Sequence, residues 1–196
     1  MSERVTGLVL AGGQARRMGG GDKGLRLFRG QTLVAHAIAR LRPQVDALLL
    51  NANQNLDLYQ SFGYPVLADA VSPRVEAYAG PLAGLHAGLS ACRTDLLLSV
   101  PCDSPLLPLD LADRLRRGLV ASGADLAVAR TTSGLQPVFS LYRLSVLDSL
   151  GRYLDGGGRK IDRWQASLNL ATVDFDDEAA FVNINTLDEL EKLQQP

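Results

Sequence analysis

The residues best suited to chemistry lie in a glycine-rich stretch near the N-terminus. Residues 12–24 contain six glycines, two arginines and a lysine, and they follow the apolar run Val5–Leu10. Glycines let backbone amides approach phosphate closely, and cationic side chains balance its negative charge. The stretch predicts a loop that binds a nucleoside triphosphate, with a disordered surface loop as the alternative.

Two commoner kinds of phosphate-binding loop fit this stretch poorly. It contains no GxxxxGK[S/T] motif, so a P-loop NTPase is not supported. Residues 19–24 satisfy GxGxxG, but they follow an arginine-rich loop rather than a strand. The second predicted strand is also followed by Asn51 instead of the acidic residue that a dinucleotide site uses.

A carboxylate follows a later apolar run. Asp103 lies in Pro101-Cys102-Asp103-Ser104-Pro105, where prolines on both sides restrict the backbone. Mg²⁺ prefers oxygen ligands and takes one or two carboxylates besides phosphate oxygens and water. Asp103 is therefore the predicted Mg²⁺ ligand, with an aspartate that caps the next helix as the alternative. Asp22 is expected to order its loop rather than to supply a second ligand.

The chain alternates strand-length apolar runs with helical patterns, which predicts a doubly wound, mostly parallel α/β sheet with helices on both faces. In such a sheet, ligands bind beyond the carboxyl ends of the strands, where the glycine-rich stretch and Asp103 both fall. The expected pairs of strand and helix are Val5–Leu10 with Thr32–Leu41, Val45–Leu50 with Leu56–Phe62, Pro65–Ala68 with Pro81–Ala91, and Leu96–Val100 with Leu109–Val120.

The second half of the chain departs from this alternation. Leu126–Arg130 is expected to pair antiparallel with Pro137–Tyr142 across a turn at Thr131–Gln136, which makes the sheet mixed. Helices are predicted at Leu144–Leu154, at Ile161–Leu168, and at Leu187–Gln194 after an N-cap at Thr186. Without a linker or repeat, residues 1–196 are expected to form a single domain.

Composition excludes several classes of protein. The formal net charge of −1 argues against a nucleic-acid partner. Two cysteines without a CxxC motif, and two isolated histidines, argue against disulfides and zinc. The N-terminal apolar run is too short for a signal peptide, and no apolar stretch approaches the roughly 18 to 20 residues of a bilayer span. A cytoplasmic protein with no membrane partner is expected.

Three motifs, LAGGQARRMGGGDKG, PCDSP and FVNINTLDEL, together resemble those of the molybdenum cofactor guanylyltransferase family, which belongs to the GT-A-like nucleotidyltransferases. The resemblance covers nearly the whole chain, and Ala70–Ala79 is a local departure. It implies transfer of GMP from Mg-GTP to the terminal phosphate of molybdopterin, giving the guanine dinucleotide cofactor and pyrophosphate. It also implies a transient contact with molybdoenzymes or their chaperones.

The resemblance assigns roles to individual positions. Its nucleotide-binding residues are Leu10, Ala11, Gly12 and Gly13 through the backbone, Lys23 at the phosphates, Asn51 and Asp69 near the base and ribose, and Asp103 as the Mg²⁺ ligand; its cofactor-side residues are Gly80, Pro81, Asn183 and Asn185. Arg17, Lys23 and Asp103 are the expected catalytic residues. They would neutralise charge, and a dianionic phosphate nucleophile needs no strong general base.

Other interpretations stay open. Asn51 and Asp69 are alternatively turn residues, and Gly80-Pro81 is alternatively an ordinary helix start. The basic group Arg159, Lys160 and Arg163 could line the cofactor's phosphate, but a solvated helix face is favoured. A cytidylyltransferase acting on the same cofactor, a sugar-phosphate nucleotidyltransferase and a non-catalytic cofactor carrier are the competing functions.

Overall fold

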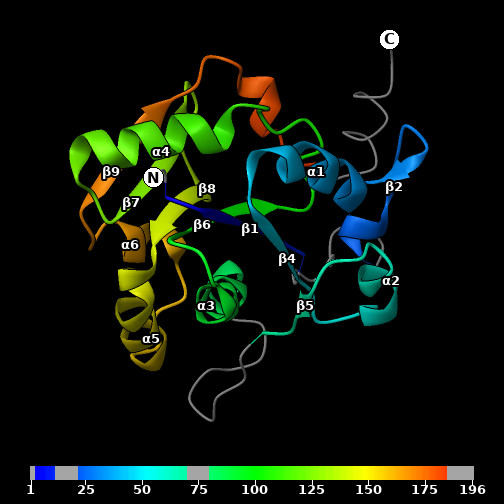
Figure 1. The fold of residues 1–196 in the computed structure, drawn as a ribbon, viewed down its shortest axis with the longest axis horizontal. Coiled ribbons are helices and arrows are strands. Elements are labelled where there is room, and N and C mark those ends of the chain that lie inside the picture. The colour runs from blue at the N-terminus through cyan, green and yellow to red at the C-terminus, as the bar shows by residue number, and fades with distance from the viewer. Residues whose placement is uncertain (1–2, 12–21, 70–79, 185–196) are drawn as a thin grey trace.

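The computed structural model describes residues 3–11, 22–69 and 80–184. Within these ranges the main sheet has seven strands in the order β5-β4-β1-β6-β8-β7-β9 (Figure 1). The strands are β1 (Val5–Leu10), β4 (Ala47–Asn51), β5 (Val66–Leu67), β6 (Leu96–Pro101), β7 (Leu126–Thr131), β8 (Gly134–Arg143) and β9 (Leu170–Asp174), and β2 (Leu27–Phe28) pairs with β3 (Gln31–Thr32) in a separate hairpin.

The sheet is mixed, as predicted. Strands β5, β4, β1 and β6 run parallel, and β8 runs antiparallel to both β6 and β7. All residues of β1 and β6 are buried, which explains why these strands are uninterrupted runs rather than alternating patterns. The predicted α/β fold with a mostly parallel mixed sheet is confirmed.

Helices cover both faces of the sheet (Figure 1). The helices α1 (Leu33–Leu41) and α4 (Leu111–Ser122) pack over one face, whereas α3 (Pro81–Ala91), α5 (Leu147–Asp155) and α6 (Ile161–Gln165) pack over the other. Helix α2 (Leu56–Gln60) lies near β5. Four 3-10 helices complete the described elements: η1 (Lys23–Leu25), η2 (Arg42–Gln44), η3 (Leu144–Val146) and η4 (Glu178–Phe181).

Several predicted boundaries were wrong. Strand β8 begins at Gly134 rather than Pro137, because Gly134 has a φ of 119° and closes a shorter turn than expected. The register of β7 against β8 shifts between Val128, which pairs with Ser140, and Ala129, which pairs with Gln136. Helices α2 and α6 end earlier than predicted. The helix expected at 187–194 and the Ala70–Ala79 departure lie outside the described residues.

Two features were not predicted. The β2–β3 hairpin consists of two-residue strands, too short for a periodic pattern to reveal. Strand β9 adds a parallel edge next to β7, and its partly buried sequence LATVD carries two β-branched residues, Thr172 and Val173, which are common in strands.

Candidate functional site

The ends of four parallel strands meet at one edge of the sheet, which we call the carboxyl edge: the residues that follow β1, β4, β5 and β6. Backbone hydrogen bonds join the neighbours there, from Cys102 N to Leu10 O (3.0 Å) and from Ala11 N to Asn51 O (2.8 Å). The Leu10 carbonyl and the Ala11 amide are therefore already used in hydrogen bonds between neighbouring strands. Contacts of Leu10 and Ala11 with a nucleotide stay a prediction, and they would have to use the other backbone groups of these two residues.

The carboxyl edge brings Lys23 and Asp103 together. Lys23 Nζ forms an ion pair with Asp103 Oδ2, although the residues are 80 positions apart, and the two side chains are only 18% and 12% exposed. Asp103 Oδ1 is buried and accepts no hydrogen bond from any described residue. A carboxylate removed from water in this way is costly unless a cation or donor compensates it. Asp103 Oδ1 is therefore the atom of the site at which a bound cation or donor would be most stabilising.

Asp22 organises the backbone around Lys23. Its carboxylate caps η1 by accepting from Gly24 N at 3.0 Å, and it also accepts from the Tyr59 hydroxyl at 2.7 Å and from Asn55 Nδ2 at 3.2 Å. These contacts agree with the expectation that Asp22 orders its loop. Burial, with the neighbouring Cys102 and Asp22, raises the pKa of Tyr59 well above its ordinary value, so its hydroxyl stays a donor.

Gly24 explains the last position of the DKG motif. A Cβ atom at Gly24 would lie 2.5 Å from Tyr59 Oη and 3.2 Å from Cys102 Sγ. Any larger residue would push η1 away from β6. Cys102 itself is fully buried, and burial raises its pKa, so it has none of the thiolate character of a nucleophile.

Asn51 and Asp69 are also brought together. Asn51 is 2% exposed and donates from Nδ2 to Asp69 Oδ1 at 2.9 Å and to Leu67 O at 3.1 Å. Asn53 holds Asp69 as well, donating to Oδ2 and accepting from Asp69 N, both at 2.8 Å. The half-buried Asp69 is thus fixed in one orientation by two amides. This order is compatible with the turn interpretation and with a carboxylate prepared for a ligand.

The first turns of α3 lie beside Asn51. Gly80 precedes α3 with a φ of 68°, and Pro81 is its first residue. A Cβ atom at Gly84 would lie 2.1 Å from Asn51 Oδ1, so glycine is needed for the helix to approach the asparagine. Helix α3 therefore packs against Asn51 at Gly84, and the role of Gly80 and Pro81 toward a ligand stays a prediction.

The segment after η4 is tied to the Asp103 turn. Ser104 Oγ donates to Asn183 Oδ1 at 2.5 Å, and Ile184 N donates to Asp103 O at 3.0 Å. Asn183 is exposed, whereas Ser104 is completely buried. The structure thus brings the predicted residue Asn183 next to Asp103 through Ser104.

The basic group lies elsewhere. Figure 1 places α5 and α6 at the end of the molecule opposite η1 and α2. Arg159 Nη1 donates to the carbonyl oxygens of Leu154 and Gly158, which caps the end of α5, while Lys160 and Arg163 are exposed. These contacts favour the interpretation of a solvated, helix-capping group over a wall for a cofactor phosphate.

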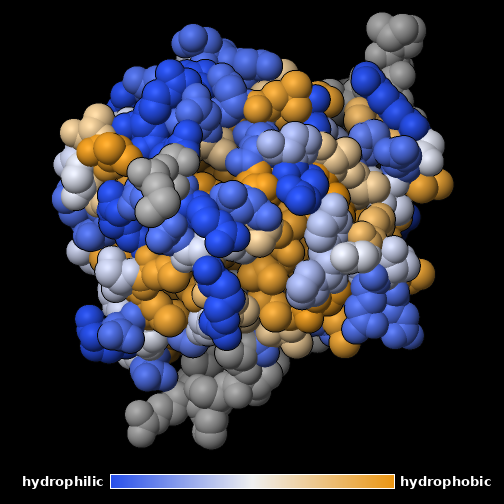
Figure 2. Space-filling view, in the orientation of Figure 1, coloured by the Kyte–Doolittle hydropathy of each residue, from blue (hydrophilic) through white to orange (hydrophobic). Residues whose placement is uncertain are grey.

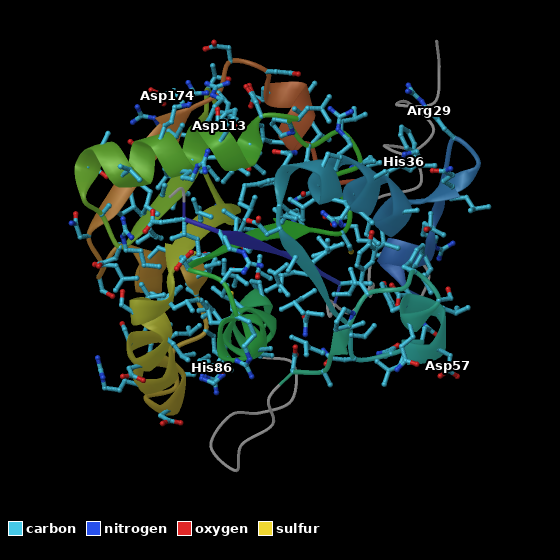
Figure 3. The ribbon with its side chains drawn as sticks, in the orientation of Figure 1. Arg29, His36, Asp57, His86, Asp113 and Asp174 are labelled. Atoms are coloured by element: carbon cyan, nitrogen blue, oxygen red, sulfur yellow. The ribbon has the colours of Figure 1, made fainter. Side chains whose placement is uncertain are left out.

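Both histidines make contacts within the fold, away from the carboxyl edge (Figure 3). His36 Nε2 lies 2.7 Å from Phe28 O, and its ring packs edge-on against Phe28, which holds the β2–β3 hairpin on α1. His86 lies on α3, where its Nε2 is 3.7 Å from the Cβ position of Gly151 on α5. Neither is part of the carboxyl edge.

Some predicted residues lie outside the described part of the chain: Gly12, Gly13, Arg17 and Asn185. Conversely, the sequence did not single out Tyr59 or Ser104. Tyr59 is the buried residue of a five-residue helix whose length gives no periodic signal. Ser104 lies in the PCDSP motif, but its hydrogen bond to Asn183 joins residues 79 positions apart, which no local pattern reveals.

The chain is similar to a known family of nucleotidyltransferases. A family model described as the MobA-like NTP transferase domain matches residues 7–170. The molybdenum cofactor guanylyltransferase of Cupriavidus pinatubonensis is 54% identical over 191 residues, covering 95% of this chain and 94% of the relative. The protein of the same name from Ralstonia nicotianae is 50% identical over 200 residues, covering 97% and 96%.

Solved structures share the fold. The molybdopterin-guanine dinucleotide biosynthesis protein A from Archaeoglobus fulgidus superposes with a TM-score of 0.80 at 24% identity, covering 96% of each chain. The 4-diphosphocytidyl-2C-methyl-D-erythritolsynthase from Anaerococcus prevotii gives 0.77 at 11% identity, covering 98% of this chain and 97% of its own. At such identities the likeness concerns the fold alone.

No helix among the described residues is both long and apolar enough to cross a membrane. The family model spans most of the chain, and the curated relatives match it almost from end to end, so the resemblance drawn from the three motifs is confirmed. The chain belongs to the family of MobA-like NTP transferases.

Proposed function

We propose that this protein transfers GMP from Mg-GTP to the terminal phosphate of molybdopterin, forming the guanine dinucleotide cofactor and pyrophosphate. The observation that carries the proposal is the buried Lys23–Asp103 pair at the carboxyl edge, with one carboxylate oxygen unpartnered among the described residues. The names of the curated relatives support the choice of nucleotide and acceptor.

The residues present fit a divalent cation. Asp103 offers a buried carboxylate oxygen with no described hydrogen-bond donor, and Mg²⁺ completes its shell with phosphate oxygens and water rather than with many protein ligands. The absence of a group of three or more His, Cys, Asp or Glu among the described residues is compatible with such a site. When bound, the ion would polarise the phosphates and neutralise their charge.

The chain's own residues have distinct tasks in the transfer. An oxygen of the molybdopterin phosphate forms a bond to the α-phosphorus of GTP, while the bond from that phosphorus to the bridging oxygen breaks and pyrophosphate leaves. Two polyanions must approach each other, so the reaction needs positive charge more than it needs a base. Lys23 supplies that charge from η1, and Arg17 is the second candidate.

Base recognition is assigned to Asn51 and Asp69. Guanine presents N–H donors that a carboxylate accepts, and Asp69 is held in one orientation by Asn51 and Asn53. Because Asn51 is buried and its amide already donates to Asp69, it would act mainly by orienting that carboxylate. Leu10, Ala11, Gly12 and Gly13 would hold the nucleotide through the backbone.

The acceptor side is assigned to Gly80, Pro81, Asn183 and Asn185. Asn183 is exposed beside the Asp103 turn, which supports its contact with the molybdopterin phosphate. In this proposal residues 1–196 act as one nucleotidyltransferase domain in the cytoplasm, and the product passes to molybdoenzymes or their chaperones by transient contact.

The test supplies the purified protein with molybdopterin, Mg²⁺ and each of the four NTPs in turn, and measures pyrophosphate release. Release with GTP alone, dependent on molybdopterin, is the expected result. Turnover with CTP alone would identify a cytidylyltransferase instead, and turnover with a sugar phosphate in place of molybdopterin would change the acceptor. No turnover with any NTP would leave a cofactor carrier.

A further inference from the structure

Tyr59 was not predicted as a site residue, but it lies against the segment that carries Lys23. It is completely buried, and its hydroxyl donates to Asp22 Oδ1 at 2.7 Å. Asp22 immediately precedes Lys23, and the Cβ position of Gly24, which follows Lys23, is 2.5 Å from the same hydroxyl oxygen. The tyrosine therefore contacts the chain on both sides of the lysine.

The 3-10 helix that carries Lys23 is not stabilised by its own hydrogen bonds alone. Helix η1 has three residues, and its backbone hydrogen bonds are long, 3.3 Å from Leu25 N to Asp22 O and 3.2 Å from Arg26 N to Lys23 O. Short 3-10 helices have poor hydrogen-bond geometry and depend on contacts from outside. The Asp22 carboxylate supplies such contacts, because it binds Gly24 N within the helix and Tyr59 and Asn55 outside it.

The hydroxyl group is costly at this position unless it serves Asp22. A phenylalanine would fill the same apolar space without burying a polar atom, and a buried tyrosine hydroxyl needs a partner. A hydrogen bond to a charged acceptor is stronger than one between neutral groups. The bond to Asp22 is thus a firm link from the short helix after β4 to the segment that bears Lys23.

We propose that Tyr59 is a positioning residue, which holds Lys23 against Asp103 by fixing Asp22 at the start of η1. The inference rests on the proposed function for its consequence in catalysis, but the positioning itself is a property of the protein without ligands. Tyr59 would contact neither substrate nor metal.

The test compares Tyr59→Phe with Tyr142→Phe, which removes another completely buried hydroxyl. Tyr142 belongs to β8 and its hydroxyl accepts from Gln165 Nε2 at 2.7 Å, remote from η1. Acetylation by a soluble acylating reagent is followed by mass spectrometry at Lys23, with the exposed Lys160 as the internal reference. Tyr59→Phe is expected to raise the relative rate at Lys23 about tenfold, and Tyr142→Phe is expected to leave it unchanged.

A second variant shows whether the effect passes through Asp22. If it does, Tyr59→Phe combined with Asp22→Ala labels no faster than Asp22→Ala alone, because the two changes break one link. Equal relative rates at Lys23 in Tyr59→Phe and Tyr142→Phe, or additive effects in the double variant, would overturn the inference.

A kinetic measurement connects positioning to catalysis. Tyr59→Phe is expected to lower kcat/KM for Mg-GTP about tenfold while leaving the KM for molybdopterin unchanged. The labelling needs no nucleotide, so a failure of the positioning inference appears there. A failure of the proposed function appears instead as an unsubstituted protein that turns over no GTP.

Discussion

The Lys23–Asp103 and Arg130–Asp174 pairs join opposite charges in contrasting surroundings. At the carboxyl edge, the Lys23 and Asp103 side chains are 18% and 12% exposed. At the other end of the sheet, Arg130 on β7 and Asp174 on β9 are 47% and 66% exposed. Arg114 of α4 donates to the backbone oxygen of Asp174, which is labelled in Figure 3, and Figure 2 shows hydrophilic side chains gathered over α4.

The difference separates function from stability. Exposed ion pairs contribute little to folding because water and salt screen them. A buried pair loses the hydration of both ions, and an apolar pair of the same size is often as stable. Burial of Lys23 and Asp103 is therefore a cost in folding that makes sense when a ligand uses the charges. Five predictions test this contrast.

The largest effect is expected from Asp103→Asn. The change keeps the size of the side chain but removes the charge that would hold Mg²⁺, so kcat/KM should fall about 10³-fold. The Mg²⁺ titration of pyrophosphate release should shift to higher concentration. An unchanged titration would show that another group binds the ion.

Lys23→Ala should lower kcat/KM for Mg-GTP about 10²-fold, because a positive charge at the phosphates is lost. The melting temperature should also fall, because the change leaves the buried Asp103 carboxylate without its cation, so turnover is measured below the melting temperature of the variant. Near-normal turnover of this variant would refute the role of the lysine.

Asp69→Ala should reduce the preference for GTP over ATP about tenfold, since a fixed carboxylate for the base is lost. Asn51→Ala should have a smaller effect that disappears in the Asp69→Ala background, because Asn51 acts on Asp69. Competition between the two nucleotides measures the preference. An unaltered preference would assign both residues to the turn alone.

Gly84→Ala and Gly118→Ala compare the two regions directly. An added Cβ atom would lie 2.1 Å from Asn51 Oδ1 in the first case and 2.4 Å from Val173 Cγ2 in the second. Overpacking costs about 1–3 kcal/mol, partly offset by about 1 kcal/mol of helix propensity. Calorimetry should give a lower melting temperature for both variants, but only Gly84→Ala should weaken the preference for GTP over ATP. A loss of preference in Gly118→Ala would remove the contrast.

The smallest effect is expected from Arg130→Ala. The pair with Asp174 is exposed, so the melting temperature should change by less than about 2 °C and turnover should not change. A large fall in turnover would mean that the distal strands communicate with the carboxyl edge.

The sequence predicts the frame of the molecule well and its local connections poorly. Val5–Leu10 and Pro81–Ala91 are strong local signals, and the structure has the strand and the helix at the predicted residues. The β2–β3 hairpin is too short to produce a pattern. The pairing of β9 with β7 joins residues 44 positions apart, which local patterns do not reveal.

The candidate site divides in the same way. Asp103 stands out because a carboxylate follows an apolar run, and Lys23 stands out because it lies in the glycine-rich stretch. The hydrogen bonds of Tyr59 to Asp22 and of Ser104 to Asn183 link segments that are 37 and 79 residues apart. Only the fold brings such partners together, so no spacing rule could have found them.

A crystal structure of the protein with Mg-GTP tests the central claim most directly. The account predicts a metal ion on Asp103 Oδ1, with Lys23 Nζ on the phosphates and guanine beside Asp69. Phosphates bound away from the carboxyl edge, with Asp103 holding no ion and still paired with Lys23, would contradict it.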